Sequence, residues 1–443
     1  MNYPIIPYSP IIIDTTCKNL WYSALQCFCS SDNCRGHVEK KLQELWRGPS
    51  NPNHVMPLLS VRTGFDLFLM VKKYPPGSEI IMSAINIPDM CEIARSHGLI
   101  IIPLDISIDT LEPKLELLPK LITAKSVAIV VAHLYGRLIN MDPFIDIAAQ
   151  HGLAVIEDCA ESFCGFENIG HPSADISLFS FGAIKFYTSL GGSIAKIRDI
   201  EMYEKMLSIH MSYPVQKADM YFKKVMKYIF IYSWLQVKPL PLIGRKVLNR
   251  FGVDYKSIFV KWMRGFPDKM IEMIRWQPST ALLLTMLHRH ESFKQTEFNL
   301  QRLKAVYLLN NLPEGYDHVG LATKVNNFWL FPVLVEEPDT VVGILNVLGV
   351  DAYRGATQLN IIEPENKEEL KTFFAEEKSP LNACYPHEAK YLIDHVIYLP
   401  VNKFIPFQDI DKMIKACNVA LKVIKSVDKK HFHPKSKLLK SKL

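Results

Sequence analysis

Residues 153–197 read LAVIEDCAESFCGFENIGHPSADISLFSFGAIKFYTSLGGSIAKI, and this stretch decides the fold. It contains three short, mostly apolar runs: Leu153–Ile156, Ile176–Phe181 and Ser193–Ile197. Runs of that length without polar alternation are typical of strands buried on both faces of a sheet. The stretch therefore predicts buried strands, and we expect the loops that follow them to carry the chemistry.

Similar runs occur earlier in the chain, at Glu79–Met82, Leu99–Leu104 and Ser126–Ala132. Helical spacing separates several of the runs, as at Asp142–His151. Strand, helix and strand in that order indicate βαβ units around a largely parallel sheet, which binds ligands at the carboxyl ends of its strands. The predicted fold class is therefore α/β, and 443 residues leave room for a second, smaller domain.

Composition and charge narrow the class of protein. Hydrophobic residues make up 49% and charged residues 22% of the chain, as in ordinary globular proteins. No apolar run approaches the roughly 20 residues of a membrane-spanning helix, and the N-terminus lacks the basic start of a signal peptide. The formal net charge of +6 comes from one segment and a tail, without a nucleic-acid-binding module, so we expect no nucleic-acid partner.

The nine cysteines are odd in number and scattered along the chain. This usage predicts reduced thiols in the cytoplasm and no disulfides. Cys27, Cys29, Cys34 and His37 lie close together in sequence, but their spacing matches no familiar zinc finger or zinc ribbon. We therefore expect no metal.

Charge and periodicity divide the chain into regions. Between Lys217 and Arg275 there are thirteen Lys or Arg and four Asp or Glu, which marks a basic insertion. From Ser279 helical and strand-like patterns resume and indicate an α+β domain. The predicted regions are an N-terminal segment at 1–59, a large cofactor-binding domain at 60–212, a basic amphipathic insertion at 213–275, a small C-terminal domain at 276–427 and a Lys-rich, disordered tail at 428–443.

Asp158 ends the apolar run of the motif Val155-Ile156-Glu157-Asp158-Cys159-Ala160. A carboxylate at the end of a strand can pair with the pyridine nitrogen of pyridoxal phosphate and keep that nitrogen protonated, which makes the ring an electron sink. The alternative interpretation is that Asp158 caps a helix that follows the strand.

Lys185 ends the motif Leu178-Phe179-Ser180-Phe181-Gly182-Ala183-Ile184-Lys185, again a strand followed by a loop. A lysine on such a loop can bind the cofactor covalently, and the hydroxyl of Ser180 can donate to its phosphate. Gly191 and Gly192 follow and leave backbone without side chains where a planar cofactor must fit. Taken alone, Lys185 would more often be a surface lysine.

A third motif, Arg62-Thr63-Gly64-Phe65-Asp66, precedes a helical pattern. The amides of Gly64 and Phe65 at a helix start would suit the cofactor phosphate, because exposed N–H groups and the helix dipole attract anions. An ordinary turn explains a glycine before a helix equally well.

Together with His133-Leu134-Tyr135-Gly136, these motifs resemble the DegT/DnrJ/EryC1/StrS family of pyridoxal-phosphate sugar aminotransferases over most of residues 30–425. The resemblance implies a fold-type I pyridoxal-phosphate-dependent transferase, with a large domain built on a mostly parallel sheet and a smaller C-terminal α+β domain. It also implies roles for site residues: Lys185 as the Schiff-base lysine, Asp158 as the partner of the pyridine nitrogen, and Ser180, Gly64 and Phe65 as phosphate ligands.

The sequence departs from the family pattern at three places. Glu161 stands where the family usually has glutamine, and it would add a negative charge beside the cofactor. Residues 84–88 offer no aromatic side chain to stack on the ring. The asparagine that commonly reaches the phosphate from a second subunit has no clear counterpart before Arg275.

Two functional hypotheses follow. The first is a pyridoxal-phosphate-dependent aminotransferase that moves an amino group from a donor such as glutamate to a keto-sugar, free or linked to a nucleotide or lipid. The second is a catalytically weak protein of the same fold that binds a membrane surface or a protein partner. Stable covalent cofactor at Lys185 favours the first hypothesis, and its absence favours the second.

The resemblance implies a cytoplasmic homodimer. In addition, residues 217–275 combine lysines with an apolar face that includes Tyr221, Phe222, Ile229, Phe230, Trp234 and Leu235, which predicts a peripheral site for an anionic membrane surface. The alternative is a helical hairpin that packs against the protein itself. The final Ser441-Lys442-Leu443 matches a peroxisomal signal, which we interpret as coincidence in a tail rich in these residues.

Overall fold

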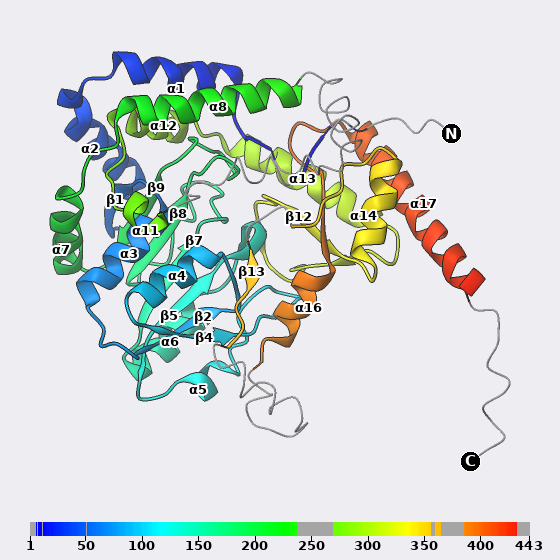
Figure 1. The fold of residues 1–443 in the computed structure, drawn as a ribbon, viewed down its shortest axis with the longest axis horizontal. Helices are drawn as coiled ribbons and strands as arrows, with labels where there is room; N and C mark the ends of the chain where they lie inside the picture. The colour runs from blue at the N-terminus through cyan, green and yellow to red at the C-terminus, as the bar shows by residue number, and fades with distance from the viewer. Residues whose placement is uncertain are drawn as a thin grey trace.

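The computed structural model describes residues 6, 8–10, 12–49, 51–236, 269–355, 359–364 and 385–431. Its centre is a seven-stranded sheet in the order β1-β9-β8-β7-β5-β2-β4 (Figure 1). These strands are β1 (His54–Leu58), β2 (Glu79–Ser83), β4 (Ile100–Leu104), β5 (Ser126–Ala132), β7 (Ala154–Cys159), β8 (Ile176–Ser180) and β9 (Ser193–Ile197). The strands from β4 to β8 pair in parallel, and β9 pairs antiparallel with both β8 and β1. All six strands predicted from the apolar runs are present, so the α/β class is confirmed.

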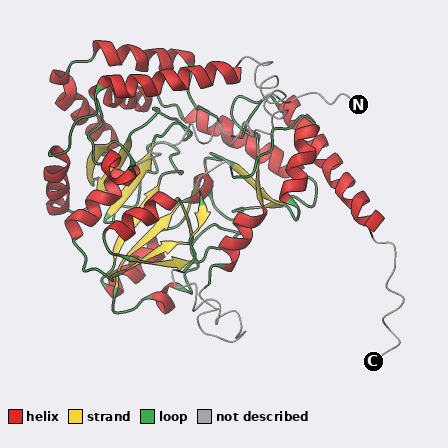
Figure 2. Cartoon of the chain, in the orientation of Figure 1, coloured by secondary structure: helices red, strands yellow, loops and turns green. Residues whose placement is uncertain are grey.

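The central strands are largely apolar because helices cover both faces of the sheet (Figure 2). Along β5, Ala128 and Val130 face the layer of α3 (Val61–Lys72), α4 (Pro88–Ser96) and α7 (Ile200–Met211). Their neighbours Ile129 and Val131 face the layer of α5 (Leu118–Leu121) and α6 (Asp142–His151). Adjacent residues of a strand point to opposite faces. A strand with helices on both faces therefore buries side chains on both, which favours apolar residues.

Four helices form a further layer beside β1, β8 and β9. They are α1 (Cys17–Cys29), α2 (Arg35–Trp46), α8 (Ala218–Gln236) and α12 (Thr280–Glu291). The short 3-10 helix η1 (Asp32–Cys34) lies between α1 and α2. Trp46 is fully buried at their centre, with the rings of Phe179, Phe181 and His290 around it. The buried Lys196 of β9 donates to the carbonyls of Trp46 (2.9 Å) and Asn51 (2.7 Å). These contacts fasten the N-terminal helices to the sheet.

A second unit contains the three-stranded antiparallel sheet β10-β12-β14, with β10 (Asp317–His318), β12 (Phe331–Leu334) and β14 (Val396–Leu399). The helices α13 (Gln295–Asn311), α14 (Pro338–Val347) and α17 (Phe407–His431) pack around it. This is the smaller α+β unit expected from the sequence. The helical pattern that resumes at Ser279 forms two helices, α12 and α13, with a break between them. The bounds of the five regions stay a prediction.

Two short strand pairs join the units. β3 (Ile85–Asn86) pairs with β13 (Asn360–Ile361), and β6 (Arg137–Leu138) pairs with β11 (Val325–Asn326). Both pairs link residues far apart in sequence, and they bring the second unit to the carboxyl ends of the central strands. α11 (Met270–Ile274) and α16 (His387–His395) complete the elements used here. Among the described residues, no helix has the length and apolar character needed to span a bilayer.

Candidate active site

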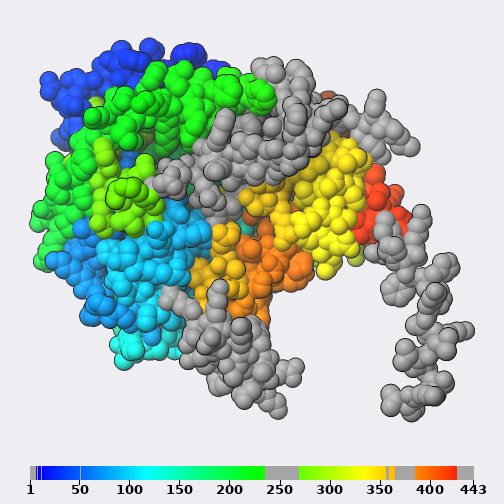
Figure 3. Space-filling view, in the orientation of Figure 1, coloured from blue at the N-terminus to red at the C-terminus, as the bar shows by residue number. Residues whose placement is uncertain are grey.

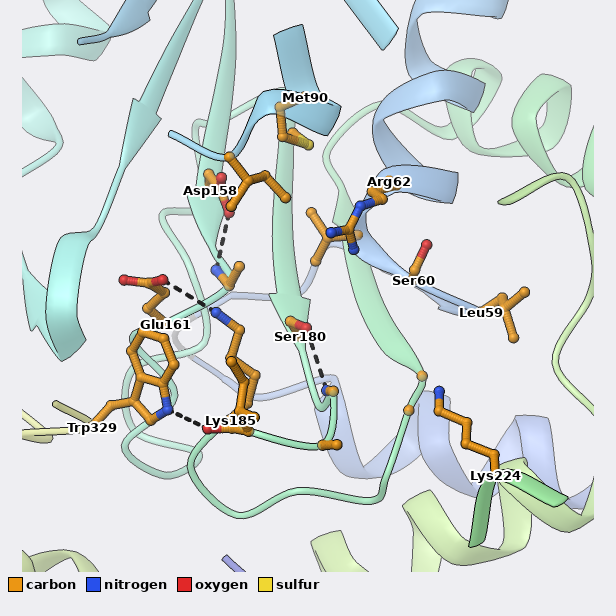
Figure 4. A pocket seen from close by; sticks show the side chains of 18 of the residues that line it. Leu59, Ser60, Arg62, Met90, Asp158, Glu161, Ser180, Lys185, Lys224 and Trp329 are labelled. Atoms are coloured by element: carbon orange, nitrogen blue, oxygen red, sulfur yellow. Dashed lines mark hydrogen bonds and ion pairs between the residues drawn. The ribbon is translucent and has the colours of Figure 1, made fainter. Parts of the chain in front are cut away.

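A cavity of about 450 Å³ lies at the carboxyl ends of β5, β7 and β8 (Figure 4). The ends of these strands contribute His133, Asp158 and Ser180 to its wall. The start of α3, the helix α8 and Trp329 of the second unit line the rest. The cavity is therefore at the edge of the sheet where the fold class predicts a ligand.

Lys185 enters this cavity from the loop after β8. A turn closed by the bond from Lys185 N to Gly182 O (2.9 Å) directs the side chain inward. Its Nζ lies 3.2 Å from Glu161 Oε1 and 4.1 Å from the centre of the Trp329 ring. The indole nitrogen of Trp329 donates to the carbonyl of Ile184, beside the lysine. The lysine is thus held between a carboxylate and an aromatic face.

Glu161 is buried and engaged at both oxygens. Its Oε2 accepts the amide of Tyr135 (2.8 Å), and Oε1 meets Lys185. Burial raises the pKa of Glu161, and the charge of Lys185 and the Tyr135 amide act in the opposite direction. The amide of Asn327 donates to the Glu161 carbonyl (2.9 Å) and so ties this residue to the second unit.

Asp158 lies at the end of β7 and is almost fully buried. Its Oδ1 accepts the amide of Ala160 (3.1 Å), and a turn follows at residues 160–162. No helix begins there, so the helix-cap interpretation finds no helix to cap. Burial raises the pKa of Asp158, which the Ala160 amide and the charge of Lys185 counteract. The carboxylate of Asp158 is therefore shielded from bulk solvent and lies in the wall of the cavity.

His133, Glu157 and Cys159 gather beneath the cavity with their polar atoms within 4.8 Å of one another. The Nδ1 of His133 accepts the amide of Ile139 (3.2 Å), so its Nε2 carries the hydrogen and donates to Glu157 Oε1 (2.9 Å). Burial raises the pKa of Glu157, but the hydrogen bonds from His133, Ser177 and the amide of His171 outweigh it and lower the pKa. Both ring nitrogens are occupied, so this group supports the sheet and does not offer a metal site.

The cysteines considered for zinc are free thiols. Cys27 donates to the carbonyl of Ser23 and Cys34 to that of Ser31, and Cys29 is exposed. No carboxylate or imidazole joins them in a metal-binding group within the part of the chain that the structure describes.

Ser180 lines the cavity with its hydroxyl beside the amide of Gly182 (3.4 Å). The Gly191-Gly192 backbone lies next to it, because Phe181 N donates to Gly192 O and Gly191 N donates to Phe181 O (both 3.0 Å). Gly192 N also donates to the carbonyl of Leu59 (3.2 Å), just before α3. The loop after β8, the glycines and the start of α3 therefore meet at one end of the cavity.

Gly64 and Phe65 do not line this cavity, contrary to the prediction that their amides hold phosphate. The helix begins at Val61, earlier than its sequence pattern suggests, and Gly64 N is bound to Ser60 O within the first turn. A Cβ on Gly64 would lie 2.6 Å from Leu178, so this glycine provides close contact between helix and sheet. The residues of α3 that line the cavity are Val61 and Arg62, next to Ser60.

Among the cavity-wall residues that sequence patterns missed are Trp329 and Lys224. Trp329 comes from beyond the insertion, and only the pairing of β6 with β11 brings it here. Lys224 comes from α8 within the basic segment. A local signal for Lys224 was available, because it shares a helix face with the fully buried Tyr221, Val225 and Tyr228.

The apolar face of α8 packs against α1 and α12. Of the residues expected to face a membrane, Tyr221 is buried, Phe222 and Ile229 are partly buried, and Phe230 is exposed. Residues 218–234 therefore pack in part against the protein itself, and membrane binding by the basic segment stays a prediction. The side chain of Leu235, and Lys238, Trp262 and Phe266 altogether, lie outside the described residues.

Comparison with known proteins agrees with this geometry. Residues 36–416 match the model of the DegT/DnrJ/EryC1/StrS aminotransferase family. A UDP-4-amino-4-deoxy-L-arabinose–oxoglutarate aminotransferase of Shewanella sediminis is 28% identical over 38% of this chain and 43% of its own length. GDP-perosamine synthase of Caulobacter vibrioides is 30% identical over 34% of this chain and 42% of its own length. The alignments thus span less than half the length of these curated relatives.

Among solved structures, NtdA of Bacillus subtilis with bound cofactor PMP superposes with a TM-score of 0.63. The match covers 95% of this chain and 86% of that one, at 16% identity. At that identity the likeness concerns the fold alone.

Proposed function

The chain belongs to the DegT/DnrJ/EryC1/StrS aminotransferase family, and we therefore propose that it is a pyridoxal-phosphate-dependent aminotransferase. It takes an amino group from an amino acid such as glutamate and transfers it to a keto-sugar, free or carried on a nucleotide or lipid. Lys185 is the catalytic lysine and Asp158 the partner of the cofactor's ring nitrogen. The observation that supports this most is the position of Lys185 Nζ inside the cavity, between Glu161 and Trp329.

The cavity fits pyridoxal phosphate in its donor set. It presents an amine at Lys185, a buried carboxylate at Asp158 and a hydroxyl at Ser180. Asn86 also lines it, and its Nδ2 lies near Asp158 but makes no hydrogen bond of ordinary geometry. A buried donor without a partner is costly, so a ligand oxygen at this place would be stabilised. When bound, the cofactor supplies the electron sink for the substrate carbanion.

Lys185 and Glu161 together can move a proton. The amine of Lys185 is nucleophilic only when neutral, and Glu161 Oε1, at 3.2 Å, lies within reach to accept its proton. The family's usual glutamine cannot do this, so the acid at this position is a feature of this chain. Trp329 covers the lysine from the second unit, excludes water from it and limits its rotamers.

Asp158 has an orienting and electrostatic role. In the cavity wall its carboxylate can accept a hydrogen bond from a protonated ring nitrogen, and that bond favours the ionised carboxylate. The ion pair formed in this way would offset the desolvation that raises the pKa of Asp158.

Reductive trapping tests the assignment. Incubation with pyridoxal phosphate, reduction with borohydride and peptide mapping should place the cofactor on Lys185. The Lys185→Ala variant should take up no covalent cofactor and should show no amino transfer with any donor in a panel of amino acids. Exposed Lys205, paired with Glu201 on α7, offers a control, and Lys205→Ala should behave as the wild type. Cofactor trapped on a different lysine of the wild type would contradict the proposal.

A further inference from the structure

Lys224 reaches the cavity from α8, within the basic segment. Its Nζ lies 3.0 Å from the place that a Cβ on Gly191 would occupy, so the missing side chain of the glycine leaves room for the ammonium group. Tyr221 lies one turn earlier and donates its hydroxyl hydrogen to the carbonyl of Ser189 (3.0 Å). The helix is therefore attached to the loop that carries Gly191.

The surroundings of Gly191 define which end of the cavity Lys224 reaches. Gly191 N donates to Phe181 O, and Phe181 follows Ser180. Gly192 N donates to Leu59 O, and Leu59 precedes Ser60, the N-cap of α3. Lys224 therefore shares its end of the cavity with a serine hydroxyl, a backbone without side chains and the start of a twelve-residue helix. Each of these suits an anion, and the helix start adds the positive end of its dipole.

The side chain of Lys224 lies near two other cationic side chains. Within the described part of the chain, no carboxylate pairs with Lys224, and the charged groups that act on it are Lys227 and Arg62. Arg62 is paired with Asp89 (2.6 Å). Burial, followed by the charges of Lys227 and Arg62, lowers the pKa of Lys224 to about 8. A cation removed from water without a partner destabilises the protein, and an anion at this place would reverse that cost.

The shape of the site selects the kind of anion. Asp158 and Lys185 mark where the ring and the reacting carbon of the cofactor would lie, and Ser180 separates them from Lys224 (Figure 4). A phosphate monoester on the cofactor would be the group nearest to Lys224. By the family resemblance, the asparagine with which a second subunit commonly reaches this phosphate has no clear counterpart before Arg275, and a ligand from the same chain would take its place.

We propose that Lys224 binds the phosphate of the cofactor, together with Ser180 and the start of α3, and that the basic segment thereby completes the cofactor site within one chain. This inference rests on the proposed function, because it assumes that pyridoxal phosphate is the cofactor.

Binding of two related probes tests the role of Lys224. The apoprotein is titrated with pyridoxal 5′-phosphate and with pyridoxal, which lacks the phosphate, and covalent attachment at Lys185 is followed by absorbance. Lys224→Met removes the charge and keeps a flexible side chain of similar length. We expect it to weaken binding of pyridoxal phosphate about 10- to 100-fold, as for the loss of a charged hydrogen-bond partner, and to leave binding of pyridoxal within about twofold.

Two controls separate this effect from a folding defect. Lys217→Met makes the same change at an exposed lysine just before α8, and it should bind both probes as the wild type does. The melting temperature of apo Lys224→Met should be equal to or above that of the wild type, because the variant removes a partly buried cation that pairs with no carboxylate of the described residues. Phosphorus NMR of the loaded proteins gives a second measure: the bound phosphate should titrate with pH in Lys224→Met and stay dianionic in the wild type between pH 6 and 8.

The outcomes are distinct. A wild type without covalent cofactor at Lys185 would overturn the proposed function itself. A wild type that binds the cofactor, with Lys224→Met equal to Lys217→Met, would overturn only the role of Lys224. Equal losses for pyridoxal and pyridoxal phosphate would also overturn it, because the lysine would then act on the ring or the fold. Weak competition by inorganic phosphate in the wild type, absent in Lys224→Met, would support it.

Discussion

Glu161 lies between the Nζ of Lys185 at 3.2 Å and the backbone amide of Tyr135 at 2.8 Å. The second contact holds Tyr135 in a left-handed conformation, with φ of 53°, which a side chain rarely adopts. Glu161 therefore makes two contacts: one oxygen stabilises the turn at Tyr135, and the other faces Lys185. Glutamine could keep the first contact through its carbonyl oxygen but could not accept a proton.

We predict that Glu161→Gln changes the pH profile of cofactor attachment more than its rate. In the wild type, attachment should slow as the pH falls through the raised pKa of Glu161, because a protonated carboxyl cannot take the proton of Lys185. In Glu161→Gln only solvent can take that proton, so the rate should fall over the whole range from pH 8 to 5, and at pH 8 it should lie within about tenfold of the wild type.

Stopped-flow absorbance with pyridoxal phosphate between pH 5 and 8 measures this profile. The exposed Glu167 provides the control, and Glu167→Gln should keep the acidic decline. If Glu161→Gln kept the pH profile of the wild type, another group would be the proton acceptor.

At the scale of elements, α2 and α12 are joined by a hydrogen bond from Trp46 Nε1 to His290 Nδ1 (3.0 Å). Both rings are buried, and among the described residues Nε2 of His290 finds no hydrogen-bond partner. Burial, followed by the charge of Arg289, lowers the pKa of His290 to about 3. His290 therefore stays neutral in the folded protein, and this neutral ring is the acceptor that the tryptophan needs.

We predict that acid weakens the fold through His290. Its pKa is about 3 when folded and about 6.5 when unfolded, so the unfolded chain binds the proton first. The contribution to stability is fully present above pH 6.5 and is lost as the pH falls toward 3. The free energy of unfolding should drop by about 1.4 kcal/mol per pH unit for this one proton.

Urea denaturation at pH 7, 6 and 5 measures the slope. His290→Gln should be less stable at pH 7, because it disturbs the bond to Trp46, but its slope should be smaller by about one proton. His151, at the exposed end of α6, serves as the control, and His151→Gln should keep the full slope. An unchanged slope in His290→Gln would assign the acid sensitivity to other groups, among which buried His210 has a pKa lowered to about 4 by burial and by Arg35.

At the scale of the whole molecule, α1 and α8 lie side by side along one edge (Figure 3). Trp21, Leu25 and Phe28 follow one face of α1 at helical spacing, and each is more than half exposed. Phe230 of α8 is exposed to a similar degree. We define these four side chains as the α1–α8 ridge. Exposed apolar patches of this kind mark interaction surfaces.

We predict that the α1–α8 ridge is the contact surface of a homodimer. Light scattering should give a dimer for the wild type, and Phe28→Glu should raise the dimer dissociation constant at least tenfold, because it places a charge in an apolar contact. Val347 on α14 is exposed in the second unit, and Val347→Glu is the matched control.

Vesicle binding provides the contrasting result. If Phe28→Glu kept the dimer but lost partition onto anionic vesicles, the ridge would be a membrane surface, as the basic composition of the segment also suggested. A wild type that is monomeric and fully active would contradict the dimer.

The strands, and the meeting of Asp158, Ser180 and Lys185 at one cavity, could be predicted from local patterns. Continuous apolar runs marked the six central strands, since burial on both faces excludes polar residues. Because parallel strands share one carboxyl edge, Asp158, Ser180 and Lys185 could be placed together before any coordinates were considered. The helix start at Val61 was misjudged, because the cap at Ser60 depends on a single side-chain bond to Thr63.

Only the tertiary structure brought Trp329 over Lys185 and Lys224 to the end of the cavity formed by Gly191. Trp329 is separated from Lys185 by the whole insertion, and its position depends on the pairing of β6 with β11. The basic composition of the segment predicts a surface charge at Lys224. Because α8 packs on α1 and α12, the side chain of Lys224 lies in the cavity wall instead. Periodicity reports which face of an element is buried, whereas the partner of that face is set by long-range packing. For this reason the sequence by itself determined the sheet and the edge at which Asp158, Ser180 and Lys185 lie. The packing of α8 and of the second unit decided which side chains surround that edge.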